Sequence, residues 1–220
     1  MSRKKLVRFA QNEANPNVIQ AGKPLFETIK GQWNATQFGN DNPLVIELAC
    51  GRGEFTVGLG REFPDFNFIG VDIKGSRIWK GSSTATAEGI HNVAFLRTQI
   101  QQLESFFASG EIAELWITFP DPFPRDGDEK RRLTSPKFLE MYKHMVKVGG
   151  TIHFKTDNTG LFDYSLELIG AREDITILAY THDFYQSDMR DDHHGIKTRY
   201  EKIFSDKGEK IKYLKFCFKG

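Results

Sequence analysis

Three acidic residues, Glu47, Asp72 and Asp121, stand at the ends of separate short apolar runs. A carboxylate in such a position can accept hydrogen bonds from hydroxyl groups or pair with a cation. Glu47 would repel a diphosphate but suits a ligand that carries an ammonium and a sulfonium, and S-adenosylmethionine has both. Asp72 lies about 20 residues beyond Gly53, where an acid is expected to bind both hydroxyls of a ribose.

A glycine-rich turn, Cys50-Gly51-Arg52-Gly53, follows the first of these runs. Glycines let a ligand approach the backbone closely, and the helix that begins after them offers unpaired N–H groups. We therefore assign Gly51 and Gly53 to the cofactor site. The third glycine of the dinucleotide fingerprint would fall at position 56, which is Thr56. A glycine turn without any nucleotide stays an alternative at this point.

The segment Phe119-Pro120-Asp121-Pro122-Phe123-Pro124-Arg125 is the most unusual in the chain. The basic run Lys130-Arg131-Arg132 follows it, and we expect this run to contact phosphates. Its three prolines restrict the backbone and hold Asp121 directly after a central strand, where a methyl donor would be presented. A stiff connection with a solvated charge run is the alternative interpretation.

These positions require a parallel sheet that helices cover on both faces, because short apolar runs alternate with longer mixed segments. Ligands of such sheets bind beyond the carboxyl ends of the strands. Strands are predicted at residues 44–49, 66–72, 93–97, 112–119, 151–156, 175–180 and 210–218, and helices from residue 54 and at 76–88, 136–147 and 159–169. Gly149 and Gly150 are expected to end the third helix, and the last strand is expected to be antiparallel, exposed on one face and at an edge.

Composition favours one domain of ordinary size. The chain has 220 residues and a net charge of +1, with only two cysteines, so a disulfide framework is excluded. No apolar run approaches the ~20 residues of a membrane span, which predicts a cytoplasmic protein. We expect a basic arm over residues 1–40, with Arg3, Lys4, Lys5 and Arg8 contacting phosphates, and a catalytic domain over 41–220. No metal is predicted, because the adjacent pair His193-His194 suits a solvated loop.

Taken together in order and spacing, several motifs resemble the bacterial tRNA (guanine-N7)-methyltransferases, a family of class I S-adenosylmethionine-dependent enzymes. They are Glu47-Leu48-Ala49-Cys50-Gly51-Arg52-Gly53, Gly70-Val71-Asp72-Ile73, the PDPFP segment with Lys130-Arg131-Arg132-Leu133, Phe154-Lys155-Thr156-Asp157 and Thr198-Arg199-Tyr200-Glu201. The resemblance implies a Rossmann-like, mostly parallel seven-stranded sheet with an antiparallel last strand. It also implies methyl transfer to N7 of guanine 46 in the tRNA variable loop.

The resemblance also implies roles for single residues. Donor binding falls on Glu47, Asp72, Gln99 and Asp121, with Asp121 also catalytic, and substrate binding falls on Arg125, Asp157, Thr198, Arg199, Tyr200 and Glu201. The chain departs from the family pattern at Ala49 (usually glycine), Gln99 (an acid or amide) and Arg125 (commonly lysine). Two other functions stay open, a methyltransferase for another RNA base or small molecule and a non-catalytic RNA-binding subunit. The sequence does not decide between a monomer and a homodimer.

Overall fold

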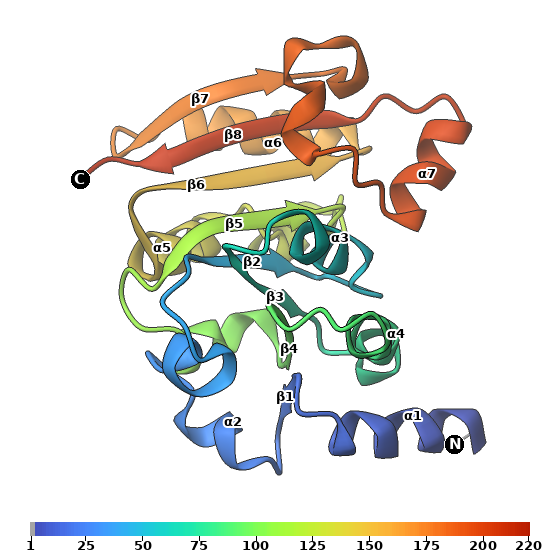
Figure 1. Ribbon diagram of the computed structural model, residues 1–220. Coiled ribbons are helices and arrows are strands. Elements are labelled where there is room, and N and C mark those ends of the chain that lie inside the picture. Colours follow the sequence, from blue (N-terminus) through green and yellow to red (C-terminus); the bar gives the residue numbers. More distant parts are fainter. Residues whose placement is uncertain (1–2) are drawn as a thin grey trace.

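One eight-stranded sheet forms the centre of the molecule (Figure 1). The computed structural model describes the backbone of residues 3–220 and the side chains of residues 5–220. The strands are β1 (Val18–Gln20), β2 (Leu44–Leu48), β3 (Asn67–Val71), β4 (Val93–Arg97), β5 (Ile112–Thr118), β6 (Val146–Thr156), β7 (Ile175–Thr181) and β8 (Lys212–Phe218). Their order is β1-β4-β3-β2-β5-β6-β8-β7, and β8 alone among them runs in the direction opposite to the other seven.

Helices cover both faces of the sheet, as the buried strand pattern requires. They are α1 (Arg3–Ala14), α2 (Pro24–Thr28), α3 (Glu54–Glu62), α4 (Gly75–Ala87), α5 (Pro136–Met145), α6 (Thr159–Gly170) and α7 (Arg199–Asp206). In Figure 1, α3 and α4 lie in front of the sheet and α5 and α6 behind it, while α7 lies beyond the strand ends. Among the described helices, none has the length and apolar character that would let it cross a membrane.

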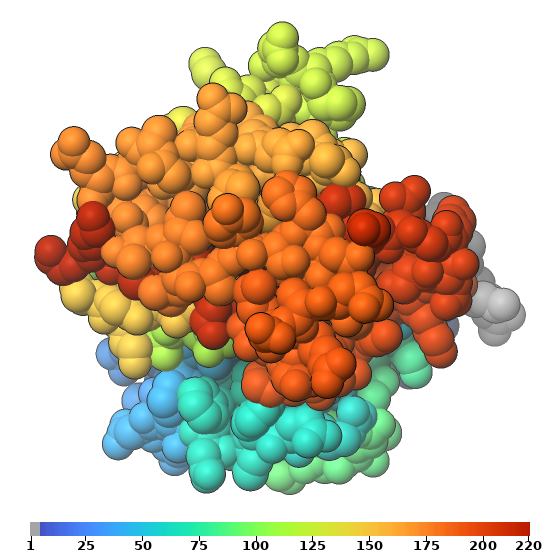
Figure 2. Space-filling model, turned by 90° about the horizontal axis from the view of Figure 1, so that it is seen from above, coloured from blue at the N-terminus to red at the C-terminus, as the bar shows by residue number. Residues whose placement is uncertain are grey.

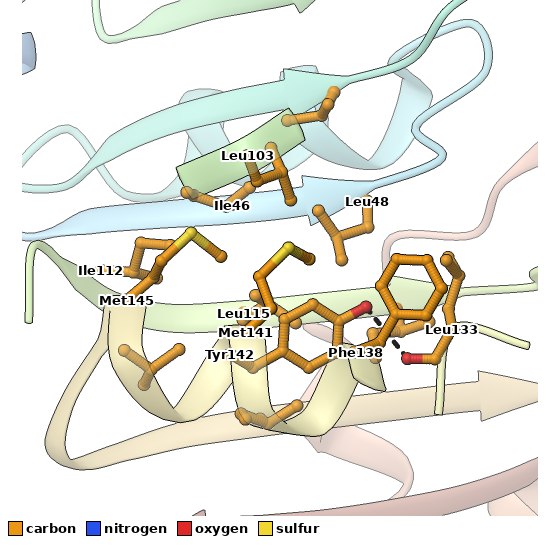
Figure 3. Packing of buried hydrophobic residues seen from close by; sticks show 14 of the residues in the cluster. Ile46, Leu48, Leu103, Ile112, Leu115, Leu133, Phe138, Met141, Tyr142 and Met145 are labelled. Atoms are coloured by element: carbon orange, nitrogen blue, oxygen red, sulfur yellow. Dashed lines mark hydrogen bonds between the residues drawn. The ribbon is translucent and has the colours of Figure 1, made fainter. Parts of the chain in front are cut away.

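Side chains that alternate along the strands divide the core into two clusters, one on each face. Ile46 and Leu48 belong to the cluster that α5 and α6 cover, whereas Val45 belongs to the other. Figure 3 shows residues of the first cluster, in which the buried hydroxyl of Tyr142 donates to the carbonyl of Leu133 at 2.9 Å. This bond satisfies a buried polar group. It also attaches the chain just before α5 to that helix.

The fold confirms the class I architecture and corrects three of the expectations. The last strand, β8, lies between β6 and β7, so β7 is the edge strand with one exposed face. The charges that suggested an exposed β8 are covered instead: Lys212 donates to the carbonyl of Asp157 at 2.7 Å, and Lys215 reaches Asp192 at 3.2 Å. Third, α5 ends at Met145, so Gly149 and Gly150 fall inside β6 rather than at the helix end.

The first 40 residues join the sheet, which therefore has eight strands and not the expected seven. β1 pairs in parallel with β4, and Asn12 of α1 donates to the carbonyl of Gly75 at 2.7 Å. Trp33 is fully buried, donates to the carbonyl of Phe106 at 2.8 Å and stacks on Phe107 with ring centroids 5.4 Å apart. A segment with these contacts is part of the core. The side chains of Arg3 and Lys4, expected on phosphates, lie outside the described residues.

Replacing Trp33 by alanine tests this integration. The change removes a large buried ring and leaves the carbonyl of Phe106 without its donor, so we expect the free energy of unfolding to fall by about 3–5 kcal/mol in urea denaturation. The control is Trp79→Ala, because Trp79 is only half-buried on α4. Equal small losses for both variants would show that residues 3–40 do not contribute to the core.

Candidate active site

The predicted acidic residues meet at one edge of the sheet, because the parallel strands that precede them end side by side. Leu48 pairs with both Val71 and Ile117, and Thr118 pairs with Lys155. Asp72, Asp121 and Asp157 follow these strand ends, while Glu47 is the last residue but one of β2.

Two adjacent cavities open at this edge. We call the first, of about 510 Å³, the Asp72 cavity; it also contains Gln99. The second, of about 470 Å³, is the Asp157 cavity, which Glu47 also lines. Both are lined by Ala49, Arg77, Phe119, Pro120 and Asp121. Asp121 therefore lies where the two cavities meet, as a residue acting between two ligands must.

Asp72 is held rigidly by the backbone around it. One carboxylate oxygen accepts from the N–H of Gly51 at 3.0 Å and the other from the N–H of Lys74 at 2.7 Å. The side chain is buried but still lines its cavity. Each carboxylate oxygen can accept a second hydrogen bond, so the group can still bind the two hydroxyls of a ribose. Gln99, exposed at the same cavity, offers an amide oxygen.

Glu47 is a buried carboxyl surrounded by hydroxyl groups. It accepts from the backbone N–H and the hydroxyl of Thr56 on α3, and from the hydroxyl of Thr118 on β5 at 2.7 Å. Burial raises the pKa of Glu47 to about 7, although the bonds from both threonines favour the charged form. A cationic ligand in the Asp157 cavity would stabilise the ionised form of this carboxyl group, which burial disfavours.

The turn after β2 is under backbone constraint. Ala49 has a φ of 56°, a conformation that costs a residue with a Cβ roughly 1–2 kcal/mol, which explains why glycine suits this position. Gly53 has a φ of 69°, and a Cβ there would lie 2.4 Å from the ring of Phe95. The turn can therefore approach β4 this closely only because residue 53 is glycine.

The proline-rich segment is fixed at both ends. Phe119 adopts a φ of 49°, and its N–H donates to the carbonyl of Lys155 at 2.9 Å. The guanidinium of Arg132 is buried, donates to the carbonyl of Phe123 at 3.1 Å and lies over the ring of Tyr164. Arg132 is thus used inside the protein, which contradicts its expected contact with phosphates. In Figure 2 the yellow-green segment after β5 projects from the body of the molecule.

The Asp157 cavity receives its other wall from the start of α7. Thr198 caps this helix by accepting from the N–H of Glu201 at 3.0 Å, and the N–H of Arg199 donates to Glu54 of α3 at 2.6 Å. Tyr200 is 51% exposed, with its ring 5.8 Å from that of Phe119. Thr198, Arg199 and Tyr200 all line the cavity together with Asp157, so four of the predicted substrate residues meet here.

Glu201 and Arg125, the other two predicted substrate residues, line neither cavity. Glu201 is fully buried, forms an ion pair with Lys155 of β6 at 2.5 Å and accepts from the hydroxyl of Tyr185 at 2.6 Å. Arg125 is exposed in the projecting segment. Sequence reasoning missed the partners Lys155 and Glu54; a lysine inside an apolar strand run was the available signal for the first.

The adjacent residues His193 and His194 lie in different environments. His193 is buried, and burial lowers its pKa to about 4, so the ring is neutral. His194 is exposed, with its ring against that of Phe63. Within the described part of the chain, His, Cys, Asp and Glu side chains form no group of three or more that could hold a metal ion.

The raised pKa of Glu47 predicts a specific dependence of stability on pH. Between its ordinary value of 4.5 and about 7, the folded chain holds a proton that the unfolded chain releases. The free energy of unfolding should therefore fall as pH rises through this window, by at most about 3 kcal/mol. Glu47→Gln removes this titration. Between pH 5 and pH 8, urea denaturation should therefore show that the free energy of unfolding falls less in the variant than in the unchanged chain. Parallel pH curves would contradict this, and Glu62→Gln, an exposed change on α3, is the control.

The Lys155–Glu201 pair predicts strong coupling. Lys155→Met alone leaves the carboxylate of Glu201 buried without its partner, and Glu201→Gln alone does the same to the ammonium of Lys155. Either change should lower the free energy of unfolding by about 3–5 kcal/mol. The double variant removes both charges, so its loss should be much smaller than the sum. Urea denaturation of the four proteins measures this. If the two losses simply add, the residues act independently; if the stable double variant has no activity, Glu201 contacts a substrate itself.

Comparison with known proteins agrees with this geometry. Residues 41–214 match a family model described as "Putative methyltransferase". The chain is 48% identical to a tRNA (guanine-N(7)-)-methyltransferase of Cytophaga hutchinsonii, with 99% of each chain covered. It is 46% identical to an enzyme of the same name from Bacteroides thetaiotaomicron, over 98% of this chain and 86% of that relative.

Solved structures with low sequence identity share the fold. The 16S rRNA methyltransferase KamB has a TM-score of 0.66 at 16% identity, covering 93% of this chain and 99% of the other. A 16S rRNA (adenine(1408)-N(1))-methyltransferase from Catenulisporales acidiphilia, solved with its cosubstrate SAM, has a TM-score of 0.58 at 12% identity, covering 86% and 91%. By its match along nearly the whole chain to such close relatives, this protein belongs to the tRNA (guanine-N(7)-)-methyltransferase family.

Proposed function

We propose that the chain transfers a methyl group from S-adenosylmethionine to N7 of a guanine in tRNA, at position 46 of the variable loop. The position of Asp121 carries this proposal, because this carboxylate lines both the Asp72 cavity and the Asp157 cavity. A methyl transferase must hold a donor and an acceptor in contact, and two adjoining cavities with a shared acidic residue meet that requirement. The two named relatives support the choice of acceptor.

The residues present fit the methyl donor. Both cavities fall within the ~300–1,000 Å³ typical of small-molecule sites. Asp72 would bind the ribose hydroxyls, Gln99 the adenine amino group, and Glu47 with Gly51 the cationic amino-acid part. When bound, the donor supplies a methyl group activated by a sulfonium. Ionised Glu47 and Asp121 would both favour this positive charge in the cavities.

The acceptor chemistry limits the role of Asp121. Guanine N7 carries a free lone pair, so the reaction needs no general base, and the new N–CH₃ bond forms as the S–CH₃ bond breaks. Positive charge passes to the purine, and the carboxylate of Asp121 can stabilise it or orient the base. The exposed ring of Tyr200 beside Phe119 offers a surface on which an unstacked base can lie.

The alternatives are weaker on the same observations. A small-molecule acceptor would suit an enclosed site, whereas the Asp157 cavity is walled by the exposed residues Arg199 and Tyr200. A non-catalytic RNA-binding subunit would not need Glu47, Asp72 and Asp121 around adjoining cavities. We also propose that the reaction takes place in the cytoplasm, as a tRNA substrate implies.

Nucleoside mass spectrometry tests this function. Unmodified tRNA transcripts incubated with the protein and labelled donor should acquire labelled 7-methylguanosine, and a transcript with adenine at position 46 should not. Asp121→Ala should lower turnover about 10²–10³-fold, far more than it weakens donor binding, because its charge acts mainly in the transition state. Asp72→Ala is the matched control and should weaken donor binding by about 1–3 kcal/mol in calorimetry.

Two results would contradict the proposal. One is a labelled nucleoside other than 7-methylguanosine, and the other is complete absence of label from tRNA when the donor binds. Equal losses of turnover and donor binding in Asp121→Ala would assign Asp121 to the donor site alone.

A further inference from the structure

Four exposed basic residues lie in a row beside the two cavities. Lys74 is the N-cap residue of α4, and Arg77 and Lys80 follow it at intervals of three, which places them on one side of the helix. Arg52 lies in the glycine turn next to α4. The opposite side of α4 is buried in the core through Ile78 and Ala85. We call these four residues the basic stripe.

The basic stripe connects the cavities with a third hollow. Lys74 and Arg77 line the Asp72 cavity, and Arg77 and Arg52 line the Asp157 cavity. Arg52 and Lys80 then line a groove of about 240 Å³ between α3 and α4. Contact between the turn and the helix is direct, since a Cβ on Gly81 would lie 2.7 Å from the carbonyl oxygen of Arg52.

The charges of the basic stripe are not neutralised within the protein. In the described part of the chain, none of the four residues forms an ion pair, whereas the neighbouring Arg61 pairs with Glu88. The nearest acid in the groove is Glu54, whose carboxylate already accepts from the N–H of Arg199 at 2.6 Å. Exposed unpaired cations in a row attract a polyanion.

The dimensions suit a nucleic-acid strand. From the N-cap residue Lys74 to Lys80 the helix axis rises about 9 Å, so the basic residues along it can meet successive phosphates of one strand. Arg77 and Arg52 border the Asp157 cavity, so a strand on the basic stripe passes its mouth, where a base can enter. The groove at the far end is lined by the unpaired cations Arg52 and Lys80, together with Arg61, which pairs with Glu88, and the acid Glu54.

We propose that the basic stripe binds the phosphates of the tRNA strand that carries the target guanine, and that the groove between α3 and α4 holds one of these phosphates. This inference rests on the proposed function, because it takes the acceptor to be tRNA. Phosphate contacts set the position of the strand without reading its sequence. The stripe thereby brings the base to the Asp157 cavity, and Asp157 and Tyr200 contact the base itself.

Equilibrium binding of an unmodified tRNA transcript, measured at several salt concentrations, tests the inference. The double variant Arg52→Ala/Lys80→Ala should weaken binding at least about fivefold and reduce the slope of log affinity against log salt by about 1.4–1.8, the value for two lost phosphate contacts. The control is Lys30→Ala/Lys147→Ala, two exposed lysines near the start of β5 at the opposite edge of the sheet. It removes the same charge and should leave the slope almost unchanged.

A charge-conserving variant separates electrostatics from shape. Arg52→Lys/Lys80→Arg should keep the slope of the unchanged chain, and thermal unfolding should show that all variants fold. Identical slopes for Arg52→Ala/Lys80→Ala and the control Lys30→Ala/Lys147→Ala would overturn the inference. Binding is measured without methyl transfer, so a chain that binds tRNA through the stripe but forms no 7-methylguanosine would contradict the proposed function alone.

Discussion

The close packing of Phe95 against glycine is the constraint on which the site depends. A Cβ at Gly53 or Gly81 would lie within 3 Å of the ring of Phe95, so neither position accepts a side chain without movement. Phe95 belongs to β4, Gly53 ends the turn after β2, and Gly81 lies in α4. One buried ring thus fixes the distance between the turn and the helix. The groove between α3 and α4, which Gly53 and Gly81 line, follows from that distance.

A second constraint holds the opposite wall. The start of α7 contributes Tyr200 to the Asp157 cavity, yet the helix has only 8 residues and little intrinsic stability. Its position therefore depends on contacts with the rest of the fold. Glu201 reaches Lys155 on β6, and the N–H of Arg199 reaches Glu54 at the start of α3. The exposed residues of α7 can face a substrate because the buried Glu201 between them forms an ion pair with the sheet.

Local pattern was sufficient for most of the fold, and tertiary contacts account for the rest. The strand Val93–Arg97 could be predicted to the residue because its apolar run is bounded by polar ones. β1 escaped detection because three residues, Val18–Gln20, carry no periodicity. Gly149 and Gly150 predict a helix end from the sequence alone, because glycine is typical of both helix ends and β-bulges. Acids at strand ends could be predicted as a site, whereas the burial of Glu201 and Arg132 depends on partners distant in sequence.

The electrostatics of the two cavities suit a cationic donor and a polyanionic acceptor at once. The acids Glu47 and Asp72 are buried at the strand ends, where low solvent access strengthens their effect on a nearby positive charge, whereas Asp121 is exposed where the two cavities meet. The cations Arg52 and Lys80 lie outside, on the rim, where solvent screens their repulsion of the donor but a chain of phosphates can still meet several of them. Because the buried acids Glu47 and Asp72 and the exposed cations Arg52 and Lys80 lie at different depths, the donor and the tRNA phosphates do not compete for these groups. A guanine base, which is uncharged until it receives the methyl group, is the part of the nucleic acid that can enter the acidic interior.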